Sequence, residues 1–447
     1  MAEKKAPGKA RRMTHMKVLA IAFLLAIFYI GSATFPSTVT NISHMDPTHG
    51  LAAIYDAQNK INKDYSDMLD FKHSNFKNKA SYINMNGLMA RLMGQRYINE
   101  RVKLNNGHLG AASMSSAKQA IGAEIEVKVS HKKNREIPAV LQMAKLNESQ
   151  NDKGKVLLFV MAPNQNPKYE DVLPTGYAEG FNRNADNLLD GLSGNGVPFL
   201  DLREEMKNDG IGHSEAFFVT DHHWKPETGF WAYAKTIAYL ETASAIEPVN
   251  PVLTDINEFD IDVYKDVYLG SSGKRTGRYF AGLDDFSVIT PKFKTDMSLE
   301  IPSSSISRQG GFAEVAYSHR DITIDFFNTS IYSIYGHGNR DLMLWRNDAA
   351  PIDLKVLALG DSFSNVYFTF FPLVFTTFDQ MDLRQCEEGF DFLEYYSAFD
   401  PDIVIIQVNA SSISNPNTTY DFFNDLQDEG ATPGSFGEDD SIGDLME

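Results

Sequence analysis

Cysteine and basic residues are scarce in this chain of 447 residues. The single cysteine, Cys386, excludes an internal disulfide and any paired-cysteine metal or redox motif. Lys and Arg total 41 against 59 Asp and Glu, and the formal charge of −18 argues against a protein that binds nucleic acid by neutralising phosphates. With 43% hydrophobic and 22% charged residues, the composition also excludes wholesale disorder and a polytopic membrane protein.

A long apolar run occurs near the N-terminus, where a basic flank precedes the uncharged residues 18–35, VLAIAFLLAIFYIGSATF. This pattern is typical of a signal anchor or a signal peptide, and a buried core helix would not normally begin with such a cluster of cations. We expect residues 1–35 to hold the protein in the cell membrane as a single pass, with the basic end cytoplasmic and the remainder extracytoplasmic. If Gly31 and Ala33 belong to a cleavage site, the protein is secreted instead.

Beyond residue 75, continuous apolar runs alternate with helical patterns. Such runs predict strands buried on both faces of a sheet. Helices are predicted over 177–192 and 229–243, and the βαβ rhythm predicts an α/β fold with a parallel sheet and flanking helices. The four strands are expected at 155–161, 197–202, 355–359 and 403–408.

Composition sets the expected boundaries of the other segments. Residues 36–75 are a polar spacer, and residues 76–423 form the main domain. Within that domain, residues 244–330 are rich in Ser, Thr, Asp and Gly and predict a β-rich insertion. Residues 111–150 look helical and charged. The acidic tail, residues 424–447, is expected to be disordered.

The segment RVKLNNGHLG, residues 101–110, predicts a β-hairpin, because Asn105, Asn106 and Gly107 tolerate a positive φ.

Three polar clusters lie at or near predicted strand ends, where open parallel sheets bind ligands. They are Asp221-His222-His223-Trp224, Gly360-Asp361-Ser362-Phe363-Ser364 and Asn409. Together they supply a nucleophilic set, since a serine needs a base and a histidine needs a carboxylate to fix its tautomer. On an extended segment, Asp221 and His223 would face the same way and could both approach Ser362. The alternative for Ser362 is a helix cap.

GDSFS (360–364) combined with DHHW (221–224) resembles the SGNH-like O-acetyltransferases of bacterial exopolysaccharide systems. These include the alginate acetylation proteins and, more closely, the DHHW-protein family. The likeness extends over about residues 70–415 and includes VLLFVMAPNQNPKY, YLGSSGKRTGRYFAG and PDIVIIQVN. Unlike hydrolytic SGNH enzymes, the chain has its Asp/His block before the serine. The resemblance implies an SGNH-like, flavodoxin-like fold.

The resemblance also implies roles. Ser362 would be the nucleophile, His223 the general base and Asp221 its orienting carboxylate, without a cofactor. An acetyl group would pass from a membrane-bound O-acyltransferase to Ser362 and then to a hydroxyl of a polysaccharide acceptor. The Ser362 N–H and the Asn409 side chain are candidates for the oxyanion donors.

Other residues near the motifs have two interpretations each. Trp224 either packs beneath the site or forms a platform for a sugar ring. His222 is expected to face away and bond a neighbouring loop, or else to act as a second catalytic histidine. The cations of the Gly/Ser loop either bind an acidic polymer or are simply solvated; they are Lys274, Arg275 and Arg278.

A zinc site is a less favoured alternative. His213, His222, His223 and Asp221 are residue types that zinc accepts. We predict no metal, because Asp221 and His223 already have expected roles in the triad and the sequence has no HExxH motif.

Two competing functions remain open at the level of sequence. If water rather than a sugar accepts the acyl group, the same triad would make the protein an extracytoplasmic esterase or deacetylase. Alternatively, the chain is a non-catalytic, membrane-tethered scaffold that binds polysaccharide. The sequence identifies neither the polysaccharide nor the acyl donor.

Overall fold

The structure is a computed structural model, and it describes residues 79–111, 128–130, 136–175, 180–318, 322, 326–387 and 389–413. The chain divides into two units, residues 1–82 and 83–447, and everything below concerns the second. The predicted signal anchor, spacer and acidic tail lie outside the described residues. Among the described residues, no helix combines the length and apolarity that a membrane crossing requires.

An eight-stranded sheet forms the centre, in the order β11–β10–β12–β14–β13–β15–β6–β7. All four predicted strands are present in it. Neighbours from β14 to β7 are parallel, whereas β12, β10 and β11 add an antiparallel extension. The strands are β6 (Val156–Ala162), β7 (Phe199–Asp201), β10 (Met297–Ile301), β11 (Ile306–Gly310), β12 (Leu342–Arg346), β13 (Ile352–Gly360), β14 (Phe375–Met381) and β15 (Ile403–Asn409).

The sheet is therefore mixed: the predicted parallel sheet is confirmed from β14 to β7 and is wrong at this edge. The reason lies in the connection between β10 and β11, which is the 3-10 turn η4 (Pro302–Ser304) followed by Ser305 with φ of 51°. So short a link joins antiparallel neighbours only, since a parallel pair needs a long crossover.

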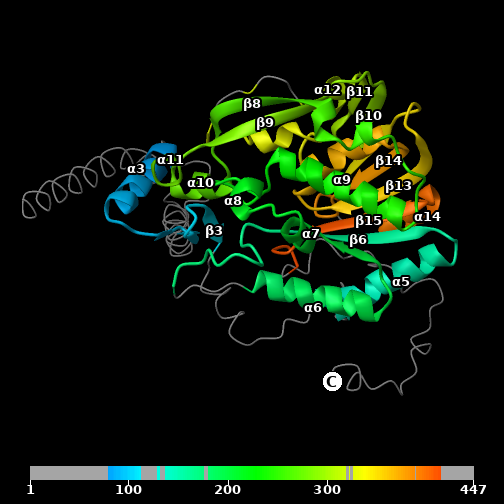
Figure 1. The fold of residues 1–447 in the computed structure, drawn as a ribbon, viewed down its shortest axis with the longest axis horizontal. Coiled ribbons are helices and arrows are strands. Elements are labelled where there is room, and N and C mark those ends of the chain that lie inside the picture. Colours follow the sequence, from blue (N-terminus) through cyan, green and yellow to red (C-terminus); the bar gives the residue numbers. More distant parts are fainter. Residues whose placement is uncertain are drawn as a thin grey trace, which may run out of the picture. The chain divides into compact units, whose positions relative to one another are not determined.

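Helices cover both faces of the sheet. Along β15, Val404 and Ile406 pack with one set of helices, whereas Ile403 and Ile405 pack with the opposite core. The first set is α5 (Ala139–Asn151), α6 (Phe181–Gly194) and α14 (Phe392–Phe399); the long helix on the other face is α9 (Pro226–Thr242). Figure 1 shows α5 and α6 below the strands and α9 above them. Burial on both faces explains the unbroken apolar runs.

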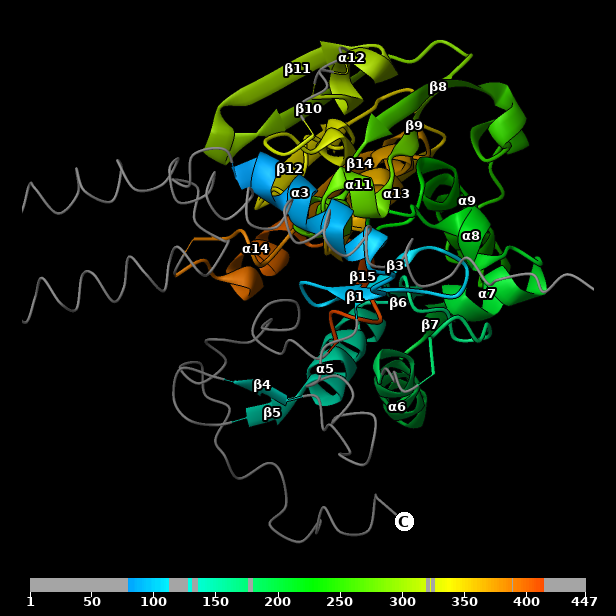
Figure 2. The ribbon, with the colours of Figure 1, turned by 90° about the vertical axis from the view of Figure 1, so that its left-hand side faces the viewer.

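The region 244–330 contains strands, as its composition suggests. β8 (Phe259–Tyr268) and β9 (Asp284–Pro291) form an antiparallel ribbon, and β10 and β11 join the main sheet. Figure 2 shows β10 and β11 at the far edge from β6 and β7. Short helices accompany these strands: α10 (Ser271–Thr276) and α11 (Arg278–Ala281) lie between β8 and β9, whereas η2 (Pro251–Leu253) and η3 (Ile256–Glu258) precede β8 and α12 (Phe312–Ala316) follows β11.

The N-terminal part of the second unit is a small three-stranded sheet. β1 (Tyr97–Ile98), β2 (Arg101–Lys103) and β3 (Leu109–Ala111) pair antiparallel, so the predicted hairpin is present, with Gly107 at φ of 92°. The helical prediction for 111–150 is wrong at β4 (Lys128–Ser130) and β5 (Glu136–Pro138), which pair as strands. The remaining elements are α3 (Lys79–Leu92), α7 (Leu202–Asn208), α8 (His213–Ala216), η5 (Ile331–Ile334), α13 (Ser364–Tyr367) and η6 (Phe368–Leu373).

Candidate active site

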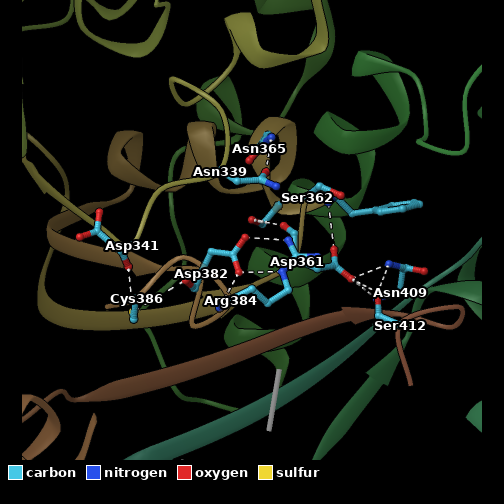
Figure 3. Close-up of polar contacts among 12 residues, drawn as sticks. Asn339, Asp341, Asp361, Ser362, Asn365, Asp382, Arg384, Cys386, Asn409 and Ser412 are labelled. Atoms are coloured by element: carbon cyan, nitrogen blue, oxygen red, sulfur yellow. Dashed lines mark hydrogen bonds and ion pairs between the residues drawn. The ribbon is translucent and has the colours of Figure 1, made fainter. Parts of the chain in front are cut away.

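Ser362 lies on a turn between β13 and α13. Gly360 ends the strand, and a Cβ there would come within 2.6 Å of the Ser364 Cβ, so the close approach requires glycine. Asp361 stabilises this turn through hydrogen bonds. Its buried carboxylate accepts hydrogen bonds from the Phe363 N–H at 2.9 Å, the Asn409 N–H at 2.9 Å and the Asn409 Nδ2 at 2.5 Å (Figure 3). The half-buried Ser362 side chain is thereby presented at the carboxyl edge of the sheet.

His223 meets this serine from a loop closed by a bridge between Phe217 and Trp224. The His223 Nε2 lies 2.7 Å from the Ser362 Oγ, and the His223 Nδ1 lies 2.5 Å from the Asp221 Oδ1. The spacing argument assumed that the segment from Asp221 to His223 is extended, but it is not. Instead the Asp221 Oδ1 also accepts the backbone N–H of His223 at 2.9 Å, which turns the chain back on itself.

Asp221 is 2% exposed and is bonded on both oxygens. Its Oδ2 accepts the N–H of Ser271, the first residue of α10, at 2.5 Å. Burial acts to raise the pKa of Asp221, but the His223 and His222 imidazoles and the Ser271 N–H outweigh it and hold the pKa below its usual value. The carboxylate therefore stays ionised.

This charge fixes the proton arrangement of the histidine. With Asp221 ionised, the His223 Nδ1 carries the proton and the unprotonated Nε2 accepts the hydrogen bond from the Ser362 hydroxyl. The ring is held from the side by Tyr332, which stacks at 4.2 Å between centroids and 17° between planes. The three side chains can thus perform proton abstraction from a serine hydroxyl.

His222 bonds a neighbouring segment, as expected, but it does not face away from the site. Its Nδ1 lies 2.7 Å from the Ser271 Oγ, while its ring centroid is 3.8 Å from that of His223. Burial and the adjacent His223 imidazole lower the pKa of His222. The donor atoms of Asp221, His222 and His223 lie within 4.8 Å of one another, a geometry that could hold a metal ion.

His213 is not part of that cluster. Its ring packs 4.8 Å from His108, and its Nδ1 lies 2.8 Å from the Asn106 Nδ2. The four-residue zinc site considered as an alternative is therefore not assembled.

Of two further candidates, Asn409 is placed differently from its sequence interpretation, whereas Trp224 is packed, the first of its two interpretations. The Asn409 amide donates both its protons, to Asp361 at 2.5 Å and to Ser412 at 2.7 Å, so it supports the serine turn rather than offering an oxyanion donor (Figure 3). Trp224 is fully buried and cannot form a sugar platform. Its indole N–H donates to the Phe363 carbonyl at 3.2 Å, which ties the histidine loop to the serine turn.

The three cations of the predicted Gly/Ser loop lie instead on α10 and α11. Lys274 Nζ donates to the Thr329 carbonyl at 2.6 Å, and Arg278 Nη2 donates to the Tyr279 hydroxyl at 3.0 Å. Arg275 forms an exposed ion pair with Glu100 at 3.4 Å. Because α10 begins at Ser271, Lys274 and Arg275 share a helix with a direct partner of Asp221. Their binding of an acidic polymer stays a prediction.

Sequence reasoning assigned no role to four residues that build the site. Asp361 lies inside the serine motif, and Gly270 and Ser271 lie inside the loop quoted for its family likeness. Tyr332 carries no local signal, because its contact with His223 arises only from the fold.

A comparison with protein families gives one match. Residues 124–257 match the SGNH hydrolase-like domain of the acetyltransferase AlgX. The matched stretch includes Asp221 and His223 and ends before Ser362. The resemblance to SGNH-like acetyltransferases expected from the sequence is confirmed by this match.

Solved structures share the fold. PatB1 of Bacillus cereus, solved with a sulfonyl adduct, is 17% identical, with a TM-score of 0.51 over 62% of this chain and 89% of that one. A DHHW family protein from Eubacterium siraeum is 14% identical, with a TM-score of 0.50 over 71% of this chain and 93% of that one. Comparison with curated protein sequences gives no significant match. At these identities, the similarity is one of fold.

Proposed function

We propose that the protein is an O-acyltransferase that moves an acetyl group through Ser362 to a hydroxyl of a cell-surface or secreted polysaccharide. The observation that carries this proposal is the continuous chain of contacts Asp221–His223–Ser362 at 2.5 and 2.7 Å. The match to the domain of an acetyltransferase supports transfer as the reaction class.

In the first half-reaction, the His223 Nε2 takes the proton of the Ser362 hydroxyl as the Oγ attacks the acyl carbonyl. Collapse of the tetrahedral adduct breaks the bond to the donor, which leaves with the proton from His223. Asp221 stabilises the imidazolium that forms between these two steps. The product is an acyl ester on Ser362.

The second half-reaction reverses the roles. A sugar hydroxyl gives its proton to His223 and attacks the acyl carbonyl, and the Ser362 Oγ leaves and recovers that proton. The backbone N–H of Ser362 is the proposed donor to the oxyanion in both steps, a contribution that typically changes the rate by about 10²–10³. Asn409 is not proposed as an oxyanion donor, because its amide protons are bonded to Asp361 and Ser412.

The proposed location is extracytoplasmic, with residues 1–35 as the membrane anchor. This part rests on the basic flank followed by the apolar run of residues 18–35. The acyl group then has to be brought across the membrane to reach Ser362. The proposed partner that supplies it is a membrane-bound O-acyltransferase.

Hydrolysis is the second candidate, because the same three side chains would activate water equally well. The test is to incubate the protein with an acetyl ester, with and without an oligosaccharide, and to quantify free acetate and acetylated sugar. Transfer predicts slow acetate release and an acetylated sugar product. Rapid acetate release that is indifferent to the sugar would favour the esterase. A scaffold without chemistry predicts that Ser362→Ala changes nothing.

A further inference from the structure

A second buried carboxylate is bonded to the two residues that directly precede Asp221. Asp284, the first residue of β9, accepts the Val219 N–H on its Oδ1 at 2.8 Å. Its Oδ2 accepts both the N–H of Thr220 at 2.8 Å and the hydroxyl of Thr220 at 2.6 Å. Asp284 is 6% exposed and Thr220 is completely buried. A side chain of β9 therefore fixes the chain immediately before the carboxylate of the triad.

The Thr220 hydroxyl extends this network to the start of α10. Because its proton is donated to Asp284, the Thr220 Oγ1 still has lone pairs, and it accepts the Gly270 N–H at 2.8 Å. The next N–H, that of Ser271, donates to the Asp221 Oδ2 at 2.5 Å. Two consecutive N–H groups at the start of α10 are thus bonded to two consecutive side chains of the histidine loop.

The donors that surround Asp284 in the described part of the chain are uncharged. Burial raises the pKa of Asp284 and the charge of Asp221 acts in the same direction, whereas the bonds from Thr220 and Val219 act to lower this pKa. A buried carboxylate without a cation is costly, so packing alone does not explain an acid at this position. An asparagine could not replace it, because its Nδ2 only donates and all three bonds need an acceptor.

We propose that Thr220 and Asp284 are positioning residues for the triad. They hold the start of α10 so that the Ser271 N–H meets the Asp221 Oδ2, and they thereby orient the Asp221 carboxylate toward the His223 Nδ1. This inference rests on the proposed function for the use of Asp221 in proton transfer. Because neither residue touches a reacting atom, their loss should lower kcat and leave KM nearly unchanged.

Two substitutions at Thr220 separate positioning from packing. Thr220→Val keeps the branched shape and removes the hydroxyl, whereas Thr220→Ser keeps the hydroxyl and removes the methyl group. With a small acetyl ester and the full chain, we expect Thr220→Val to lower kcat about tenfold, the equivalent of one buried hydrogen bond, and to change KM less than about twofold. Thr220→Ser should keep at least about half of the wild-type kcat. A packing role predicts the reverse order, because serine leaves a cavity that valine fills.

A second variant and a control accompany this pair. Asp284→Asn should lower kcat at least as much as Thr220→Val, because its amide places a donor opposite another donor. Thr236→Val is the control: it also removes a buried threonine hydroxyl, one that bonds the Ala232 carbonyl and the Tyr367 hydroxyl, and it should leave kcat unchanged. Melting curves of every variant give the folded fraction to which each kcat is referred.

A proton NMR signal tests the positioning without any turnover. The proton in the 2.5 Å contact between the His223 Nδ1 and the Asp221 Oδ1 should resonate far downfield of the amide protons. We expect this signal in wild type and Thr220→Ser, and a shifted or missing signal in Thr220→Val and Asp284→Asn.

An unchanged signal in Thr220→Val and Asp284→Asn, or a higher kcat for Thr220→Val than for Thr220→Ser, overturns the positioning role. The proposed function fails separately, when wild type shows the downfield signal but takes up no acyl group from the ester. In that case the NMR comparison of the variants still decides the positioning role.

Discussion

Gly270 is a position where one added methyl group should disable the site without replacing any of its three reacting side chains. A Cβ at Gly270 would lie 2.2 Å from the Asp221 Cβ and 2.3 Å from its Oδ2. The backbone conformation, φ −72° and ψ −176°, is open to alanine, so the effect is purely steric. In Gly270→Ala, either Asp221 or the start of α10 has to move.

The size of the effect follows from the contacts that such a movement breaks. Displacing the carboxylate lengthens its 2.5 Å contact with the His223 Nδ1 and its 2.5 Å bond from the Ser271 N–H. Loss of the orienting carboxylate costs about 10⁴ in kcat in a serine triad, and we expect Gly270→Ala to lose at least about 10² of it. Overpacking should lower the free energy of unfolding by about 2 kcal/mol.

The assay is release of nitrophenol from a small acetyl ester, followed with melting curves of the same samples. The expected result is a large fall in kcat, little change in KM and a protein that still melts cooperatively. Gly194→Ala is the matched control, because a Cβ there meets no heavy atom within 4 Å. Wild-type turnover by Gly270→Ala would show that the position of Asp221 does not matter to the reaction, and would refute the reasoning.

Three other substitutions test the supports of the site. Asp361→Ala removes the acceptor of several buried donors and should destabilise the protein by about 3 kcal/mol in urea unfolding; an effect below about 1 kcal/mol would contradict its role under the turn. Tyr332→Leu removes the ring stacked on His223 and should lower kcat several-fold, whereas Tyr332→Phe should not; equal activity of both would contradict the contact. The lowered pKa of Asp221 means that its negative charge stabilises the fold above about pH 4 and that this stabilisation is lost as the pH falls. The difference in the free energy of unfolding between wild type and Asp221→Asn should therefore be constant from about pH 5 to 8 and shrink below about pH 4. A difference that grows in acid would contradict the role of the Asp221 charge.

Local sequence patterns were sufficient for the centre of the fold. The unbroken run at β15 and the runs at β6 and β13 could belong only to strands covered on both faces, and the two cores on either side of the sheet account for them. By contrast, β14 (FTTFDQM) mixes polar and apolar residues without a clear period and was not predicted. Pairing of β10 with β12 joins residues far apart in sequence, which no local pattern encodes.

The motifs likewise predicted which side chains could react, but not how they are supported. Asp221, His223 and Ser362 could be named because their chemistry fits a triad and their motifs resemble a family. Asn409 was interpreted from its place at a strand end, yet its partner is Asp361, which only the packing of β13 against β15 reveals. Ser271 is hidden for the same reason, since α10 reaches Asp221 only through the folding of the β8–β9 region.

Mass spectrometry of the protein after brief exposure to an acetyl ester addresses the covalent step itself. The account predicts a gain of one acyl group on the intact chain, mapped to the peptide that contains Ser362, absent from Ser362→Ala and discharged by an added oligosaccharide. An acyl group on another residue, or none on wild type while ester turnover proceeds, would contradict it.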